Sequence, residues 1–192
     1  MPRYLARSSA TMPLVLDQGL FVSDPDQYRL LLASARKQLG DLSDYYPEFD
    51  KWYNQKVLPG IQSGERSIIL TYSSQALSGL AIVKRTDTEK KLCCLRVVPG
   101  FQGSGSGLKL FEKAFDILET TSPLLSVAEE RLSVFEKLFD YYGFELARHY
   151  RDIYRPQKSE FSFNGLLDSH GRPLTSISGP SYAQCPSTLA IS

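Results

Sequence analysis

Apolar side chains recur every three or four positions from Tyr28 to Leu39, which is the period of an amphipathic helix. Ser23-Asp24-Pro25 is typical of a helix start, because a capping side chain precedes a proline that fits the first turn. Gly40 is typical of a helix end. A second helix is predicted over 47–57, with Pro59-Gly60 stopping it. The first part of the chain is therefore predicted to be helical.

Strand-like segments follow these helices. Residues 67–73 and 77–85 are rich in apolar and β-branched side chains and are separated by a short polar turn, which predicts a hairpin. Lys91–Val98 is predicted to be a third strand.

Strict alternation along this third strand places Cys93 and Cys94 on opposite faces, with Leu92 beside Cys94 and Leu95 beside Cys93. Apolar residues on both faces predict a central strand. Adjacent cysteines on opposite faces are typical of packing residues rather than of a disulfide or a metal pair. Arg96 breaks the apolar pattern, and the simplest interpretation is that its stem packs while its charged head reaches water.

The second half of the chain alternates helices with short strands. A helix with one apolar and one charged face runs to Leu118, and another is predicted over 131–142. Gly143 occupies the position of a left-handed residue after a helix. The strands predicted here are 124–128, 144–154 and 159–164.

The turn after the third strand is the most informative stretch of the chain. It reads Leu95-Arg96-Val97-Val98-Pro99-Gly100-Phe101-Gln102-Gly103-Ser104-Gly105-Ser106-Gly107. Glycines let a backbone approach a ligand closely, and amides at a helix N-terminus bind phosphate. A nucleoside-triphosphate loop is excluded, because Leu108 stands where such a loop has lysine. A dinucleotide loop fails too, because the third glycine is misplaced and the preceding strands predict an antiparallel meander. A turn that binds no ligand stays as the alternative.

This stretch resembles the acyl-CoA-binding motif of the GNAT superfamily of N-acetyltransferases, without a gap from Leu95 to Gly107. Leu125-Ser126-Val127 and Tyr142-Gly143-Phe144-Glu145 resemble later parts of the family pattern. The resemblance implies an α/β (α+β) fold, with a mixed, mostly antiparallel central sheet flanked by helices. It also implies a splayed strand pair at the acyl-CoA site.

The resemblance further implies that acetyl-CoA is the co-substrate. The backbone of Leu95, Arg96 and Val97 would bind the pantetheine arm, and Phe139 would pack on it. The main-chain amides that would bind the diphosphate belong to Gln102, Gly103, Ser104, Gly105, Ser106 and Gly107.

The chain departs from the family pattern at one catalytic position. Family members commonly have a tyrosine that protonates the departing thiolate, and this chain has Phe139 there. Tyr142 is a substitute candidate on the same helix, although a core aromatic is the simpler interpretation. Glu129 is the candidate general base, and its alternative role is an acid that favours a helix N-terminus. Glu130 and Glu89 are further candidates with similar alternatives.

Residues 41–53 are dense in acidic and aromatic side chains, a composition that suits a cationic amine. The alternative is an amphipathic helix with solvated acids opposite a core face. The core interpretation is favoured for Trp52, and both interpretations stay open for Tyr45 and Tyr46.

Composition limits the other function classes. A formal net charge of +1 over 192 residues argues against a dedicated nucleic-acid binder, and no apolar run is long enough to span a bilayer. The three cysteines and two histidines lack metal-ligand spacing, so no metal site is expected. This cysteine usage predicts a reducing, cytoplasmic location.

These observations predict a single GNAT-like domain over 1–166, followed by a Ser/Pro-rich tail or arm over 167–192. The first functional hypothesis is transfer of acetyl from acetyl-CoA to a primary amine of a small molecule or protein, by direct attack in a ternary complex. The alternative is a catalytically weak module that binds CoA or a partner protein. Acetylation of a charged tRNA has no support from the net charge. An arm of this kind is able to pack on a second copy of the chain, so a homodimer is one arrangement that the sequence allows.

Overall fold

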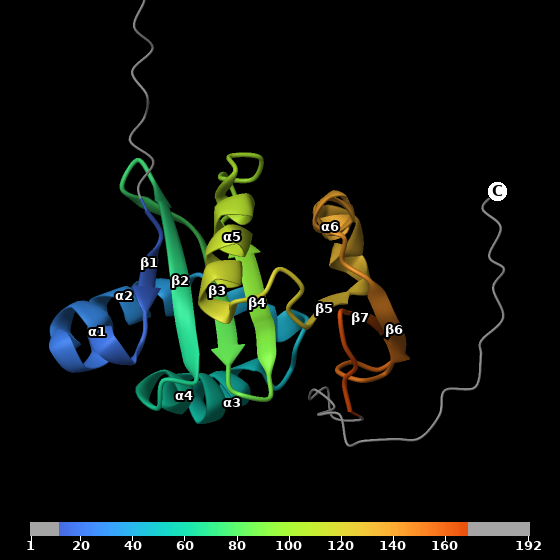
Figure 1. Ribbon diagram of the computed structural model, residues 1–192, viewed down its shortest axis with the longest axis horizontal. Helices are drawn as coiled ribbons and strands as arrows, with labels where there is room; N and C mark the ends of the chain where they lie inside the picture. The colour runs from blue at the N-terminus through green and yellow to red at the C-terminus, as the bar shows by residue number, and fades with distance from the viewer. Residues whose placement is uncertain (1–11, 169–192) are drawn as a thin grey trace, which may run out of the picture.

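The computed structural model describes residues 12–168, and these residues form two sheets with helices on their faces (Figure 1). The larger sheet has the strand order β1-β2-β3-β4 and the smaller one β5-β7-β6. All strand neighbours within the sheets are antiparallel. The strands are β1 (Leu14–Leu16), β2 (Arg66–Ser73), β3 (Ala76–Arg85), β4 (Lys90–Val97), β5 (Leu125–Ala128), β6 (Leu146–Arg151) and β7 (Ser159–Phe163).

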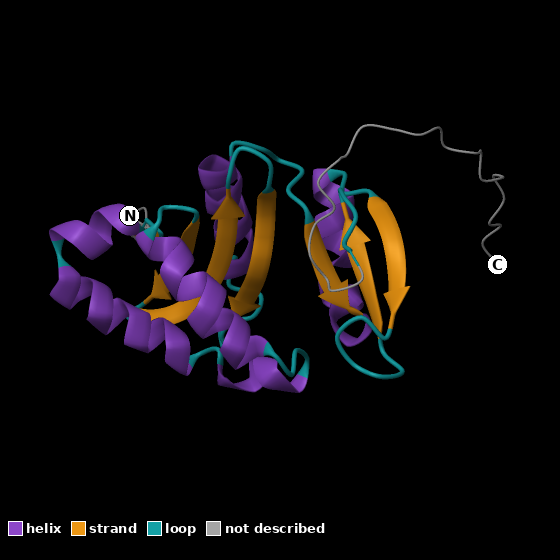
Figure 2. Ribbon diagram, turned by 90° about the horizontal axis from the view of Figure 1, so that it is seen from below, coloured by secondary structure: helices purple, strands orange, loops and turns teal. Residues whose placement is uncertain are grey.

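Helices lie on both sides of the larger sheet, so the mixed, helix-flanked fold expected from the sequence is confirmed. Figure 2 shows the N-terminal helices on one side of this sheet and α5 on the other. The helical segments are α1 (Gln18–Ser23), α2 (Pro25–Lys37), η1 (Gly40–Asp44), α3 (Phe49–Trp52), η2 (Tyr53–Val57), α4 (Leu58–Gln62), α5 (Ser106–Leu118) and α6 (Glu129–Tyr142).

The predicted hairpin is formed by β2 and β3. Its central residues are buried because helices cover the sheet on both faces. Ser74 and Gln75 connect the strands with φ angles of 48° and 68°. Two successive positive φ angles match the twist of a tight hairpin turn, so this turn forms without glycine.

β4 is bonded to β3 along one edge, while its other edge meets β5 only at its beginning. Leu92 N–H donates to Leu124 O at 3.0 Å, and Leu124 N–H donates to Lys90 O at 3.0 Å. Beyond this point no strand among residues 12–168 pairs with that edge of β4. The splayed strand pair is therefore confirmed. The prediction of a central strand is wrong, because helices cover both faces of β4 but only one edge is fully paired.

A bulge in β4 overturns the strict alternation predicted there. Ile82 lies opposite Cys94 and Val83 opposite Leu92, so Cys93 is the extra residue. Leu92 packs on the α5 side of the sheet, whereas Cys93 and Cys94 both pack on the side of the N-terminal helices. The two cysteines therefore share a side of the sheet, contrary to the prediction.

The N-terminal helices differ from the prediction at their ends. Asp24 is the cap of α2 and accepts a hydrogen bond from Gln27 N–H, whereas Ser23 is the last residue of α1. Neither α1 nor the three-residue strand β1 is predicted by the sequence pattern. Pro59-Gly60 does not stop the second helix, which continues to Gln62. The wide π turn of η2 directly precedes α4, which places the proline in the first turn of α4. Proline has no N–H to donate there, and the helix continues past it.

The smaller sheet is joined to α5 through aromatic rings. Phe139 of α6 lies 4.4 Å from Phe163 of β7 between ring centroids, and Phe111 of α5 lies 6.5 Å from Phe135 of α6. Gly143 ends α6 with φ 66° and ψ 39°, as predicted. β6 ends at Arg151 and not at 154, so the following residues form a connection to β7.

The folded part of the chain continues at least one residue past the predicted domain end at 166. Leu167 is 2% exposed, and its N–H donates to the Tyr150 hydroxyl at 2.6 Å. Residues 169–192, which make up most of the predicted tail, lie outside the described residues.

Close contact between α5 and β3 depends on Gly79. A Cβ at this position would lie 2.9 Å from the carbonyl oxygen of Arg96 and 3.0 Å from Leu110 Cδ1. We expect Gly79→Ala to lower the free energy of unfolding by about 1–3 kcal/mol, because the sheet and α5 must move apart. Urea denaturation measures this change. Gly40→Ala is the matched control, since its Cβ meets no atom within 4 Å; an equal loss in both variants would contradict the packing argument.

Candidate active site

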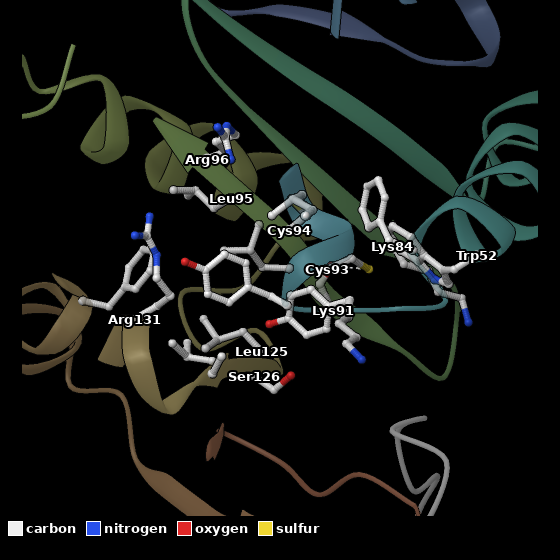
Figure 3. A pocket seen from close by; sticks show the side chains of 18 of the residues that line it. Trp52, Lys84, Lys91, Cys93, Cys94, Leu95, Arg96, Leu125, Ser126 and Arg131 are labelled. Atoms are coloured by element: carbon white, nitrogen blue, oxygen red, sulfur yellow. Dashed lines mark hydrogen bonds between the residues drawn. The ribbon is translucent and has the colours of Figure 1, made fainter. Parts of the chain in front are cut away.

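A cleft of about 1420 Å³ follows β4 from end to end and opens where β4 and β5 part. One end lies at the turn before α5, and the other lies beside Lys84 and Glu89, which precede β4. Figure 3 shows Cys93 and Cys94 of β4 across from Leu125 and Ser126 of β5. Segments η1, α3, α4 and α6 complete the walls.

The turn before α5 presents main-chain amides that have no hydrogen-bond partner in the described chain. These amides belong to Gln102, Gly103, Gly105, Ser106 and Gly107. Gly105 is the N-cap of α5 with φ 80° and provides no capping side chain, and the first turn of α5 has no acid. An uncapped helix N-terminus keeps its partial positive charge for an anion from outside the chain.

A chain of hydroxyl groups links this turn to β3 and β2. Ser106 Oγ lies 2.9 Å from Ser104 Oγ and donates to Ser78 Oγ at 3.0 Å. Ser78 Oγ donates to Thr71 Oγ1, which donates to Gly79 O, both at 3.2 Å. Ser106 therefore bonds to the sheet, Ser104 bonds to Ser106 and to Phe101 O within the turn, and neither side chain lines the cleft.

Most of the residues predicted to bind acetyl-CoA line one cleft. They are Leu95, Arg96, Val97, Gln102, Gly103, Gly105, Gly107 and Phe139. Phe139 is 3% exposed and packs against Phe135 in addition to Phe163.

Arg96 does not extend into water as the sequence analysis expected. Its Nη2 donates to Asp41 Oδ2 at 2.8 Å, and its side chain is only 17% exposed. The ion pair links η1 to β4 across the cleft wall. Arg96 Nε is buried and has no partner among the described residues.

The acids of segment 41–53 are partly neutralised by neighbouring cations. Besides the pair with Asp41, Arg36 binds Asp50 and Lys51 Nζ lies 2.8 Å from Glu48. Trp52 is partly buried under the guanidinium of Arg66, 5.7 Å from the ring centroid. The charges of Asp41, Glu48 and Asp50 are therefore balanced by these cations, and the three acids do not form an open acidic surface.

The two predicted catalytic residues point elsewhere. Glu129 accepts hydrogen bonds from Ser159 N–H at 3.0 Å and from Lys158 Nζ at 3.2 Å, and these bonds lower its pKa. Tyr142 packs on Phe115 with ring centroids 4.9 Å apart, and burial raises its pKa. Neither residue lines the cleft.

The other candidate acids are held in ion pairs. Arg155 binds both oxygens of Glu130 at 2.8 and 3.0 Å, and these hydrogen bonds lower the Glu130 pKa to about 2. Glu89 lines the cleft and pairs with Lys84.

One carboxyl group beside the cleft was missed by the sequence analysis. Glu160 of β7 is 3% exposed and accepts a hydrogen bond from the Tyr46 hydroxyl at 3.3 Å. Burial raises its pKa to about 7, against hydrogen bonds from Ser126 and Tyr46 that favour the ionised form. Tyr46, Ser126 and Tyr154 line the cleft and separate Glu160 from it. In the sequence, Glu160 alternates with Phe161 as a solvent-facing residue would, so no signal marked it.

Because the pKa of Glu160 is raised in the folded protein, its contribution to stability is greatest at low pH and is lost as pH rises through about 7. Glu160→Gln imitates the protonated group. We expect its melting temperature to match that of the wild type near pH 5 and to exceed it by a few degrees at pH 8. Thermal melts at both pH values measure this. Glu136→Gln, on an exposed part of α6, is the control and should melt as the wild type does at both. An equal shift of Glu160→Gln at pH 5 and pH 8 would contradict the raised pKa.

Neither a metal cluster nor a membrane-spanning helix is found within residues 12–168. No group of three or more His, Cys, Asp or Glu residues there is placed to hold a metal ion. None of the helices is both long and apolar enough to cross a membrane. His170 and Cys185 lie outside the described residues.

Comparison with known proteins identifies the fold. No protein-family profile and no curated protein sequence matches the chain. Among solved structures, a Desulfovibrio desulfuricans protein assigned to the GNAT family of acetyltransferases superposes with a TM-score of 0.54 at 15% identity, covering 72% of this chain and 91% of its own. The chain therefore has the GNAT fold, and the resemblance found in the sequence is confirmed at that level.

Two further structures are similar at lower TM-scores. The ribosomal-protein-S18-alanine N-acetyltransferase of Escherichia coli has a TM-score of 0.49 at 19% identity, covering 67% of this chain and 81% of its own. A streptothricin acetyltransferase candidate of Bacillus anthracis, solved with acetyl coenzyme A, has a TM-score of 0.46 at 12% identity. It covers 52% of this chain and 62% of its own.

Proposed function

We propose that this protein is an N-acetyltransferase that transfers acetyl from acetyl-CoA to a primary amine of a small molecule or a protein. The observation that supports this most strongly is the combination of an unpaired β4 edge with a row of unpartnered amides at the start of α5. Both occur in one cleft, in a fold shared with a GNAT acetyltransferase.

The two features suit the two parts of the donor. The free edge of β4 offers main-chain groups of Leu95, Arg96 and Val97 to the amide-containing pantetheine arm. The amides from Gln102 to Gly107 suit the diphosphate, because they provide donors and a helix dipole without a side-chain charge. Phe139 lines the same cleft and offers an apolar surface to the pantetheine arm.

Direct attack by the amine is favoured over an acyl-enzyme intermediate. Cys94 is a nucleophilic side chain that lines the cleft, and burial raises the pKa of its thiol to about 12. A thiol that stays protonated at neutral pH is a poor nucleophile. The raised pKa makes Cys94 a poor acyl carrier, which supports direct reaction of the amine with the thioester in a ternary complex.

The missing tyrosine affects the leaving group. Phe139 has no proton to donate to the departing sulfur. A thiolate with an ordinary pKa of about 8.5 is a stable enough leaving group to depart with help from water alone. We therefore expect transfer to be slowed and not abolished.

The test of this function is release of the CoA thiol from acetyl-CoA in the presence of one amine at a time. Benzylamine, spermidine, free lysine and the tripeptide Ala-Ala-Ala represent aromatic, polyamine, side-chain and α-amino acceptors. We expect thiol release to exceed that without amine for at least one of them, with the acetylated amine detected by mass spectrometry. Binding of acetyl-CoA with no transfer to any acceptor would instead favour the catalytically weak CoA-binding module. The observation behind that alternative is Phe139, which has no proton to donate.

The diphosphate loop has its own test at Gly105, which lines the cleft and has open space around a built Cβ. Asn and Asp have the same shape, and both tolerate positive φ better than other residues. We expect Gly105→Asp to weaken CoA binding by about 10-fold or more relative to Gly105→Asn, because a carboxylate would face the diphosphate. Isothermal titration with CoA measures both. Equal affinities for the two variants would mean that the diphosphate does not bind at this turn.

A further inference from the structure

A buried group of polar side chains lies behind the cleft, on the strand that pairs with β5, where Glu160 is opposite Ala128. Its centre is Glu160, which projects from the middle strand of the smaller sheet. Tyr46, Ser126 and Tyr154 cover it, and all three also line the cleft. The rings of Tyr46 and Tyr154 pack edge to face with centroids 5.2 Å apart.

We propose that Glu160 is the proton acceptor for the acceptor amine and that the Tyr46 hydroxyl relays the proton to it. The inference rests on the acetyltransferase function proposed above. Tyr46 is the residue that would contact the substrate, and Glu160 acts through it.

The geometry supports this route because the Tyr46 hydroxyl is shared between the two sites. It borders the cleft, and it donates its proton to Glu160 Oε1 at 3.3 Å. Its remaining lone pair is able to accept a hydrogen bond from an ammonium group in the cleft. Burial and the neighbouring Glu160 raise the pKa of Tyr46 well above its usual value. The phenol therefore passes a proton on only as it receives one.

Burial and the charges around Glu160 shift its pKa in opposite directions. Lys91 of β4 and Arg155 of the β6–β7 connection favour its ionised form, and burial opposes it. Tyr154 adds a second phenol, and Asp168 lies near enough to raise the pKa of that phenol. The balance leaves the pKa of Glu160 at about 7, which is close to the value at which a general base works best at neutral pH.

The chemical step balances without a further reactant. The ammonium gives one proton to Tyr46 Oη while Tyr46 gives its own to Glu160, which yields a neutral amine. The amine lone pair then forms the C–N bond, and the C–S bond breaks with its electron pair on sulfur. The second proton lost by nitrogen neutralises the thiolate, and Glu160 returns its proton to water after product release.

The experiment compares pH profiles of kcat/KM for the wild type, Glu160→Gln and Tyr46→Phe, using whichever of the four amines above is acetylated fastest. For the wild type we expect activity to fall as pH drops below about 7, because a protonated Glu160 accepts no proton. Glu160→Gln should be about 100-fold slower at pH 7 and recover as pH approaches the amine pKa. Tyr46→Phe should lose rate in the same pH range, while the KM for acetyl-CoA stays within about 2-fold, since neither residue is placed at the donor.

Four results decide between these outcomes. The exposed Glu136→Gln variant should keep the wild-type profile. If Glu160→Gln kept the wild-type rate and acidic limb, the relay would be wrong while the acetyltransferase function stood. If the wild type transferred acetyl to none of the amines, the function itself would fail and the relay with it.

A readout independent of activity is the pH titration of 13C-labelled glutamate carboxyl signals. The signal absent from Glu160→Gln should titrate near pH 7, and a midpoint in the ordinary range for glutamate would overturn the proposal.

Discussion

The separation of β4 from β5 is the feature on which the rest of the site depends. Strand edges inside a folded protein are normally paired, because unpaired N–H and C=O groups lose their hydrogen bonds to water. Here the pairing stops after two hydrogen bonds at Leu92 and Leu124. The remaining edge of β4 lies in a cleft, so its main-chain groups stay available to a ligand that can bond as a strand would.

The elements around the split hold the two strands apart. On one side, rings of α5 and α6 fill the space between the sheets, with Phe111 and Phe139 among them. On the other side, Tyr46 from the N-terminal helical region reaches Glu160 of the smaller sheet. The Arg96–Asp41 ion pair adds a second link between η1 and β4. The cleft is thus bordered by contacts between elements that are distant in sequence, and its shape does not depend on a single loop.

The sequence predicts those parts of the fold that local chemistry determines. The hairpin, the amphipathic α5 and the left-handed Gly143 follow from residue type and spacing within a few positions. The glycine turn belongs to the same class, since positive φ angles such as those at Gly103 and Gly105 favour glycine. The glycine turn, together with the helix that follows it, is also the part that indicated a phosphate-binding site.

Other parts depend on contacts that no local pattern records. The bulge that turns Cys93 and Cys94 to one side is set by pairing with β3, and the π turn before Pro59 by packing of the helix on the sheet. The acids chosen from the sequence, Glu129 and Glu130, directly follow β5, which lines the cleft. Folding ties them to Lys158 and Arg155 instead.

The same comparison explains why a buried carboxyl group is a better proton acceptor than the acids nearer the surface. An acid that already accepts hydrogen bonds from a cation has its ionised form stabilised, as the pKa of about 2 at Glu130 illustrates, and so has little affinity for a further proton. At Glu160 burial works in the opposite direction and keeps the affinity for a proton high. Its hydrogen-bond partners in the cleft wall, Tyr46 and Ser126, are neutral hydroxyls rather than cations, so receiving a proton does not require breaking an ion pair. Burial behind Tyr46 therefore gives this carboxyl group both the basicity and the route that the paired acids lack.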